Sequence, residues 1–451
     1  MLEIRGRAHL FCDSISRRDF LRVGCLGLTG LSLADVLRLQ EAQAATGRQS
    51  GGNNKSVILI WMPGGPSHID TCDPKPEAPS EIRGPFRPLE SSVSGIQISE
   101  MLPRQAKIMH LCTIHRGMTH NHGDHFAAAH WMLTGYPGSN AALQTPRYPS
   151  VGSVAARVLG PKVPDMLPYV VMNDGGFGYH GAAYLGAPYH PFRTGSESYG
   201  REGPPPPIAS TADLKPAPGL DEPRILRRQH LRRDVESLRR HIEQSGEINQ
   251  PRWCRDQRHA LDMVLSGKRH VAFDLSKEAP QLRERYGPGW AENALLARRL
   301  VEAGARFVTC NIGCWDDHGN IKGAMDSRLP RYDRMVATLV QDLHERGLLK
   351  DTLVVCAGEF GRTPRINAGA GRDHWPQAGC VLIAGGEYRH GQVIGATNRF
   401  GEHPVDQTLT PADLCAVIYH HLGIDPEMTL QDRSLRPIPI LKGGRVPKEL
   451  L

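Results

Sequence analysis

The chain has 451 residues, and its 54 Lys and Arg against 47 Asp and Glu give a formal net charge of +7. This length is enough for one large domain with a substantial hydrophobic core or for two modest ones. The mild basic excess favours anionic partners without identifying one. No run of eighteen apolar residues follows residue 45, so we expect no transmembrane segment in that part of the chain.

The first residues have the pattern of an export signal. Arg17 and Arg18 lie in a twin-arginine segment, Ser16 to Leu21, and a moderately apolar stretch follows at residues 23–33. Small residues at 42–44 offer a cleavage site. We therefore predict a signal peptide at residues 1–45, a Gly/Ser/Asn linker at 46–54 and export to the periplasm or beyond. The alternative is an ordinary amphipathic N-terminal helix. Twin-arginine substrates cross the membrane already folded, so the signal fits an exported metalloprotein. Since an exported protein does not meet the cell's nucleic acids, we expect no nucleic acid as a partner.

The first predicted element after the linker is a buried parallel strand at residues 57–61, ending in a Gly/Pro-rich turn at 62–70. A helix is predicted at 126–133, with Asp124 as its cap. Helical spacing recurs at 223–247, within a helical insertion at about 210–285. Six arginines line that helix. They form either a solvated face or a basic rim that attracts polyanions.

The last third of the chain alternates between helices and apolar strands. Helices are predicted at 293–304 and 332–346, and strands at 306–310, 352–356 and 380–384. Such alternation indicates an α/β fold with a mostly parallel central sheet and helices on both faces, which we assign to one domain at 55–451.

Three predicted strands run directly into groups of His, Asp and Glu, and a fourth group precedes the strand at 380–384. In open α/β sheets a ligand site lies beyond the carboxyl ends of the strands, so we expect these groups to converge. Each group alone is typical of a helix cap or a surface pair. Together, mixed imidazole and carboxylate side chains suit zinc, manganese or iron. The groups are His68 and Asp70; Asp316, Asp317 and His318; Glu359; and Arg372 with His374.

The chain has 21 histidines, and the densest group lies between residues 110 and 130. Residues 121–125 are compact enough to chelate a metal. We expect one or two of these histidines to be ligands, with His122 as the candidate, and the rest to be surface or supporting groups. The group comprises His110, His115, His120, His122, His125 and His130.

Ten cysteines are present, and eight remain after residue 45, because Cys12 and Cys25 precede it. They form no CxxC pair, which makes a zinc ribbon improbable. Cys356 and Cys380 lie in apolar runs that predict burial. Disulfides are compatible with an oxidising envelope, but the sequence does not pair the cysteines.

At these residues the chain resembles the sulfatase and alkaline-phosphatase-like hydrolases. The segment 133–137 (LTGYP) is similar to the end of the helix after their nucleophile, and 354–361 is similar to their late strand ending in Asp-His-Gly, with Glu359 in place of the aspartate. His374 matches their last metal histidine. The segments 410–414 and 422–424 resemble their C-terminal helix. More closely, the chain resembles a bacterial family filed as domain of unknown function 1501, through GGPSHID, WDDHGN, GEFGRTP, GRDHW and TPADL.

One departure from the hydrolase pattern concerns the nucleophile. Counting back from Gly135 to the expected Cys or Ser gives His125, and no CxPSR or SxPSR motif is present. Formylglycine chemistry is therefore not expected. Thr71, Ser67 and Thr119 are the remaining hydroxyl candidates.

The resemblance implies a fold and a metal site. Our leading hypothesis is a metal-dependent hydrolase of a sulfate, phosphate or related anionic ester of a small molecule or glycan, and because the nucleophile is missing we expect activated water as the attacking group. We expect one or two divalent ions, zinc favoured, with manganese, iron or calcium as alternatives. The rival hypothesis is a non-catalytic envelope protein that binds anionic glycan or scaffolds a complex. Substrate and oligomeric state stay open. Predicted ligands are Asp316, His318 and His374 at one metal, and Glu359, Asp70 and His68 or His122 at the other; Arg362 and Arg372 would stabilise transition-state charge.

Overall fold

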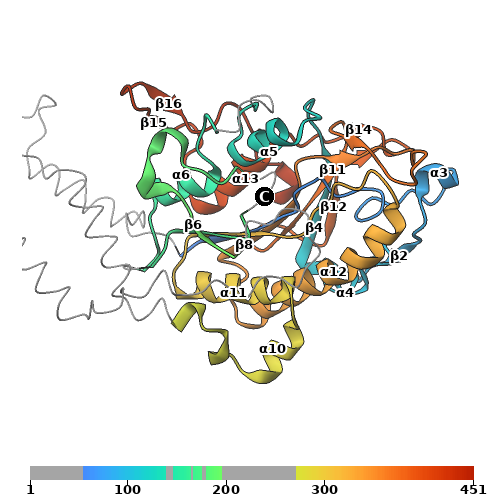
Figure 1. Cartoon of the computed structure of the whole chain (residues 1–451), viewed down its shortest axis with the longest axis horizontal. Coiled ribbons are helices and arrows are strands. Elements are labelled where there is room, and N and C mark those ends of the chain that lie inside the picture. Colours follow the sequence, from blue (N-terminus) through green and yellow to red (C-terminus); the bar gives the residue numbers. More distant parts are fainter. Residues whose placement is uncertain (1–53, 139–145, 164–165, 175–178, 196–270) are drawn as a thin grey trace, which may run out of the picture. The chain divides into compact units, whose positions relative to one another are not determined.

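The computed structural model describes residues 54–138, 146–163, 166–174, 179–195 and 271–451 (Figure 1). The described residues belong to one compact unit, 54–451. The predicted signal peptide, all but the last residue of the linker, the helix at 223–247 and the insertion up to residue 270 lie outside the described residues. In the described part of the chain, no helix is long and apolar enough to cross a membrane.

A mixed sheet of eight strands forms the centre of this unit. Seven strands point the same way. Only β11 (Gly379–Ala384) runs in the opposite direction, since it pairs antiparallel with both of its neighbours, β4 (Cys112–Met118) and β8 (Thr352–Ala357). The predicted α/β fold with a mostly parallel sheet is confirmed, and so are the four predicted strands, now β1, β7, β8 and β11. In spatial order the strands are β12 (Gln392–Ile394), β4 (Cys112–Met118), β11 (Gly379–Ala384), β8 (Thr352–Ala357), β1 (Ser56–Trp61), β7 (Phe307–Asn311), β5 (Tyr169–Met172) and β6 (Phe192–Thr194).

Both faces of the sheet are buried, as the continuous apolar runs of its central strands require. Side chains alternate along β1, so Ile58 and Ile60 enter one hydrophobic core, and Val57, Leu59 and Trp61 enter the other. The two cores are separated by the sheet.

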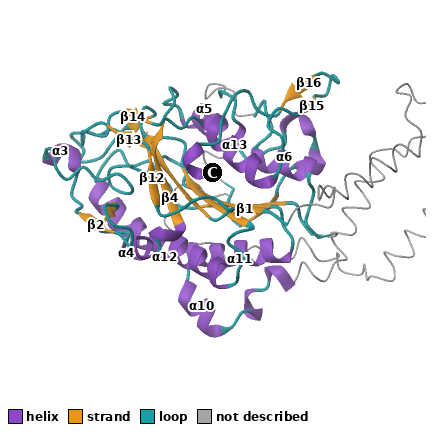
Figure 2. Ribbon diagram, turned by 180° about the vertical axis from the view of Figure 1, so that it is seen from behind, coloured by secondary structure: helices purple, strands orange, loops and turns teal. Residues whose placement is uncertain are grey.

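Helices cover the two faces in separate layers (Figures 1 and 2). The core on the Ile58 side is closed by α4 (Pro103–Lys107), α10 (Pro280–Tyr286), α11 (Trp290–Ala303) and α12 (Ile321–Glu345). The core on the Val57 side is closed by α5 (His125–Thr134), α6 (Val151–Val158) and α13 (Pro411–Leu422). Small antiparallel pairs complete the described β-strands and one short helix completes the described α-helices: β2 (Pro88–Glu90) with β3 (Gln97–Ser99), β9 (Gly361–Arg362) with β10 (His374–Trp375), β13 (Ala396–Thr397) with β14 (Pro404–Asp406), β15 (Thr429–Gln431) with β16 (Pro437–Pro439), and α3 (Ser80–Arg83).

Helix α12 is longer than the sequence predicted. It begins at Ile321, after the Asn320 cap, and continues through Pro330. The sequence interpretation started the helix at Tyr332, two residues after Pro330. Proline lacks the N–H that a helix interior needs, so a break at this position is common. Here Pro330 faces solvent, while Leu329 before it and Tyr332 after it pack in the core, and this burial carries the helix through the break.

Helix α5 confirms its predicted cap. Asp124 accepts a hydrogen bond from the Ala127 N–H at 3.0 Å, and the helix starts at the next residue, His125. The cap fixes the entry of α5 at the carboxyl end of β4.

Candidate metal centre

The candidate site lies at the edge where the parallel strands end. The loop after β7 carries Asp316 and His318, the loop after β8 carries Glu359, and the segment after β4 leads to His125. His374 reaches the same edge for a different reason. It precedes β11, and since β11 runs antiparallel, its amino end lies where the other strands have their carboxyl ends.

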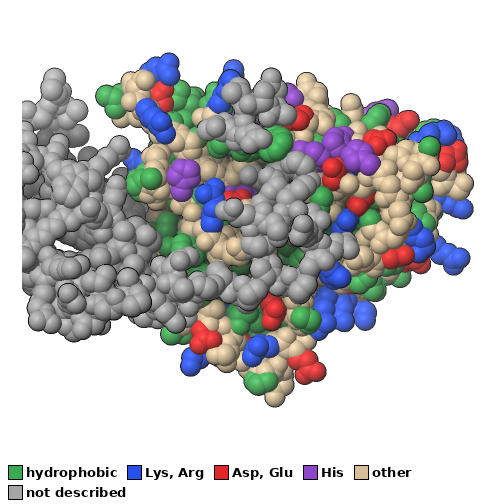
Figure 3. Space-filling view, viewed as in Figure 1, with side chains coloured by type: hydrophobic (Ala, Val, Ile, Leu, Met, Phe, Trp, Pro, Cys, Tyr) green, Lys and Arg blue, Asp and Glu red, His purple; other side chains and the backbone are tan. Residues whose placement is uncertain are grey.

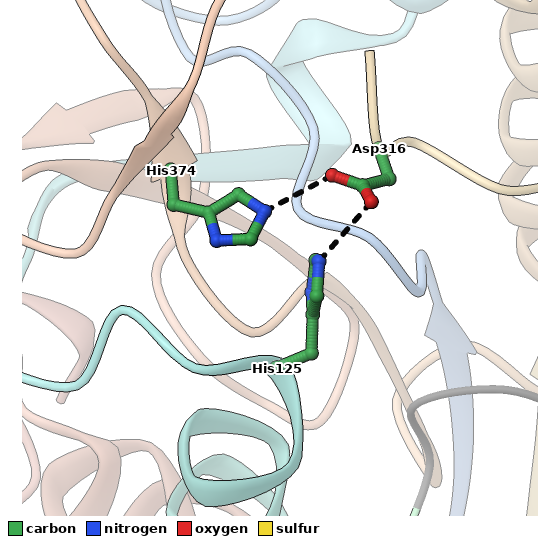
Figure 4. Close-up of side chains that lie close together, drawn as sticks. All are labelled: His125, Asp316 and His374. Carbon is green, nitrogen blue, oxygen red and sulfur yellow. Dashed lines mark hydrogen bonds and ion pairs between the residues drawn. The ribbon is translucent and has the colours of Figure 1, made fainter. Parts of the chain in front are cut away.

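Three of these side chains form a compact cluster (Figure 4). One potential ligand atom from each of His125, Asp316 and His374 lies within 4.8 Å of the others. The Nε2 of His125 is 3.3 Å from one carboxylate oxygen of Asp316, and the Nε2 of His374 is 3.0 Å from the other. The cluster therefore offers two imidazoles and one carboxylate, a donor set suited to zinc, manganese or iron.

His318 joins this cluster from the solvent side. Its Nε2 lies 2.9 Å from Asp316 Oδ1 and 3.2 Å from the Nε2 of His374. The imidazole of His318 is 48% exposed, so it can move to meet a ligand. The structure thus brings together all three residues predicted at one metal, Asp316, His318 and His374. Figure 3 shows an exposed group of histidine side chains with acidic side chains beside it.

The other ring nitrogen of each histidine faces a hydrogen-bond acceptor. The Nδ1 atoms of His125, His318 and His374 lie 2.6 Å from Glu359 Oε1, 2.6 Å from Asp373 Oδ1 and 2.8 Å from the Gly123 carbonyl, respectively. Since these acceptors hold a proton on Nδ1, the Nε2 lone pairs point at the Asp316 carboxylate and at one another. Such outer hydrogen bonds are what orient metal-binding histidines.

The cluster favours positive charge. Burial alone would raise the pKa of Asp316, but hydrogen bonds with His125, His374 and Arg362 outweigh it and hold that pKa far below its ordinary value. Burial lowers the pKa of His125, yet its contacts with Asp316 and Glu359 raise it overall. A cation or a proton is therefore stabilised between His125 and the two carboxylates.

Glu359 is fully buried and hydrogen-bonds to the loop that contains Gly64 and to His125 at the start of α5. Its Oε1 accepts hydrogen bonds from His125 Nδ1 and from the Gly64 N–H, the latter at 2.7 Å, and its carbonyl accepts one from His120 Nε2 at 2.6 Å. Its Oε2 has no partner among the described residues. Gly64 has a φ of +105°, and a Cβ there would stand 2.6 Å from the backbone nitrogen of Asp316. Only glycine allows this approach without strain.

Arg362 and Arg372 are both completely buried, which does not favour their predicted contact with substrate. Arg362 donates to Asp316 at 2.6 Å and to the carbonyls of Gly64, Gly65 and Arg372. Arg372 forms an ion pair with Asp70 at 2.7 Å and donates to the carbonyls of Ile82, Thr363 and Pro364. Both guanidinium groups hold loops together, and Arg362 also balances the charge of Asp316.

The residues predicted for a second metal are not brought together. Asp70 is committed to Arg372 and to the Ser67 hydroxyl, which donates to it at 2.5 Å. His68 donates from Nε2 to the Gly401 carbonyl at 2.8 Å. Thr71 donates its hydroxyl proton to the Ser67 carbonyl at 2.6 Å and is buried. The described contacts therefore support one metal position and give none of the three hydroxyl candidates a place in the cluster.

Two other candidate residues, His122 and Asp317, do not lie in the cluster. From the histidine-rich segment, His125 rather than His122 reaches the cluster; the His122 ring packs edge-on against Trp131 at 5.3 Å between centroids. Asp317 turns away from Asp316 and pairs with Arg328 at 2.5 Å. The signal that could have selected His125 is its place directly after the Asp124 cap, at a strand-to-helix junction.

A search of the curated proteins found no similar sequence. Several solved structures are similar to this chain. The PsFucS1 sulfatase from Pseudoalteromonas sp. is 12% identical, with 87% of this chain and 71% of that chain covered and a TM-score of 0.37. Ps i-CgsB is 10% identical, with coverage of 83% and 73% and a TM-score of 0.38. The lipoteichoic acid synthase LtaP from Listeria monocytogenes is 10% identical, with coverage of 87% and 75% and a TM-score of 0.32.

At these TM-scores, the solved structures assign neither an activity nor a substrate to this chain. The match to a family is of a different kind, because it extends over the whole described unit, residues 54–451. The chain belongs to the family described as protein of unknown function (DUF1501).

Proposed function

We propose that the protein is an exported, metal-dependent hydrolase of a sulfate or phosphate ester, or of a related anionic ester. One observation carries this proposal: three imidazole Nε2 atoms converge on the Asp316 carboxylate while each Nδ1 is committed to an acceptor. Two imidazole lone pairs only 3.2 Å apart repel each other unless a cation or a proton lies between them. The donor set thus fits a metal ion.

Asp316, His125 and His374 would hold this ion, with His318 as a fourth ligand. Zinc is favoured over calcium because nitrogen ligands predominate, and manganese or iron also suit the set. When bound, such an ion polarises an ester oxygen and lowers the pKa of a water molecule toward neutrality.

The protein's own residues orient the site. Glu359 fixes the tautomer of His125, Asp373 does the same for His318, and Arg362 holds the Asp316 carboxylate in place. Within the described part of the chain, no serine, threonine or cysteine side chain hydrogen-bonds to Asp316, His318 or His374. This arrangement supports water as the attacking group rather than a side-chain nucleophile.

The alternative function is a non-catalytic envelope protein that uses the metal centre to bind anionic glycan. One observation favours it: Arg362 and Arg372 are buried and bound to protein oxygens instead of facing a substrate. A hydrolase of anionic esters would then depend on the metal itself to hold the anion.

The test compares metal content and activity in one set of variants. The exported protein is analysed for zinc, manganese, iron and calcium, and assayed on sulfate monoesters, phosphate monoesters and phosphate diesters. We expect about one ion per chain and hydrolysis of one ester class, with both lost in His374→Ala. His344→Ala is the control, since His344 is an exposed histidine of α12.

Two results would count against the proposal. Wild-type protein with no bound metal after dialysis against zinc would remove its basis. Metal-loaded protein that binds anionic glycan but hydrolyses none of the three ester classes would favour the non-catalytic alternative.

A further inference from the structure

Two cysteines that are far apart in sequence meet beside the loop that follows β1. Cys72 is buried in this loop, and Cys380 is the second residue of β11. The Cys380 thiol lowers the pKa of Cys72, and the Cys72 thiol raises the pKa of Cys380, so the two side chains lie near each other. The neighbouring Thr71 hydroxyl also lies 3.9 Å from the Cys380 sulfur, which independently places this loop against β11. Both cysteines pack in the same hydrophobic core.

The other described cysteines lack such an arrangement. Cys112, Cys310 and Cys356 are buried within strands β4, β7 and β8, where burial raises the pKa of each thiol, to about 12 for Cys112. Cys415 is buried in α13. No disulfide joins any two of the seven described cysteines. Cys380 is accessible in part, so an oxidant can reach the pair through it.

We propose that Cys72 and Cys380 form a disulfide bond in the exported protein. The oxidant is a disulfide, either of a thiol–disulfide oxidoreductase or of a small thiol such as glutathione. One of the two thiolates attacks the oxidant's disulfide, forming a mixed disulfide and releasing one thiol. The other thiolate then attacks the protein sulfur of this mixed disulfide and releases the second thiol. Two protein thiols lose two electrons and two protons, and the oxidant's disulfide becomes two thiols.

The bond would tie together two parts of the molecule that carry the site. The loop containing Cys72 also holds Asp70, and β11 follows the β10 strand that bears His374. Cross-linking them closes a loop of about 300 residues, and long closed loops restrict the unfolded chain most. The inference rests on the export that the proposed function also assumes, but it does not depend on a bound metal or on ester hydrolysis.

The test uses full-length protein expressed with its signal and collected from the envelope after free thiols are blocked with N-ethylmaleimide. Peptide mass spectrometry without reductant should show a peptide containing Cys72 linked to one containing Cys380, with the other cysteines blocked. Separately, protein that has been reduced and then exposed to oxidised glutathione should lose two titratable thiols, and its melting temperature should rise by several degrees.

Matched variants separate this pair from the other thiols. Cys72→Ala and Cys380→Ala should each abolish the linked peptide and the rise in melting temperature, while Cys314→Ala, which removes a partly exposed cysteine outside the pair, should keep both. Full blocking of Cys72 and Cys380 in wild-type protein from the envelope would overturn the proposal. So would a stable glutathione adduct on Cys380, or a disulfide joining Cys72 to any other cysteine.

Discussion

Replacing Glu359 with glutamine tests whether the outer hydrogen bonds determine metal affinity. Glu359 Oε1 accepts from both His125 and Gly64, and Oε2 is buried without a described partner. If the glutamine oxygen keeps these two bonds, the amide NH₂ occupies the Oε2 position, where it is a buried donor without an acceptor. If the amide turns over, its NH₂ faces His125 Nδ1 and forces the proton onto Nε2, which then cannot bind a cation.

The expected loss follows from either outcome. Outer partners of metal-binding histidines change metal affinity by about 10- to 100-fold, equivalent to about 1.4–2.7 kcal/mol. Asp373→Asn is the matched control, because Asp373 makes the same contact with His318 but its carboxylate is 51% exposed. Water can replace that carboxylate, so we expect only a few-fold loss.

The assay is titration of metal-free protein with zinc in competition with a chelator, at pH 7.5 and fixed ionic strength. Thermal unfolding of the same metal-free proteins checks that Glu359→Gln folds. Affinities within twofold of wild type for folded Glu359→Gln, or equal losses in both variants, would refute the idea that the buried carboxylate orients His125.

Three further predictions concern export and stability. Changing Arg17 and Arg18 to lysine should leave the full-length precursor in the cytoplasm, as cell fractionation would show; normal processing of this variant would refute twin-arginine export. Burial lowers the pKa of His421 to about 4 although its Nε2 donates to the Ser56 carbonyl at 2.9 Å, so the unfolded state binds more protons between pH 6.5 and 4. His421 should therefore lower the free energy of unfolding by about 1.4 kcal/mol for each pH unit that the pH drops through that range. In urea unfolding, the free energy of unfolding of His421→Gln should depend less steeply on pH than that of wild type. Arg372→Met leaves the buried Asp70 carboxylate without its cation and should cost about 3–5 kcal/mol in urea unfolding, with recovery expected in the double variant that also has Asp70→Leu; equal stability of the single variant and wild type would contradict this account.

The sequence predicted the strands that are continuous apolar runs and failed on the others. Strands β1, β7, β8 and β11 were located to within one residue, because each is apolar along its length and buried on both faces. Strand β4 reads CTIHRGM, and its histidine, arginine and glycine interrupt the apolar pattern. It was missed, and without it nothing in the sequence placed His125 beside Asp316.

The predicted site residues fall into two groups: those that strand position brings to the cluster, and those that are buried against backbone carbonyls. Asp316 and His318 lie in the loop after β7, and strand position alone was enough to place them at this edge of the sheet, whereas His374 lies in β10. Arg362 and Arg372 also lie near strand ends, but the backbone carbonyls that surround them come from segments distant in sequence. A residue's type and its neighbours in sequence do not reveal such partners, so the sequence could not distinguish an arginine that faces substrate from one that holds loops.

The orientation of β11 determines where His374 lies, and local sequence does not encode this orientation. An apolar run reads the same in both directions. Had β11 been parallel to β8, the segment before it would lie at the amino edge of the sheet, and His374 would be a full strand length from Asp316. Pairing of β11 between β4 and β8 reverses it, and the β9–β10 pair then sets His374 opposite Arg362, whose guanidinium contacts Asp316. The antiparallel strand therefore positions a proposed metal ligand, and the sheet topology determines which side chains the candidate site contains.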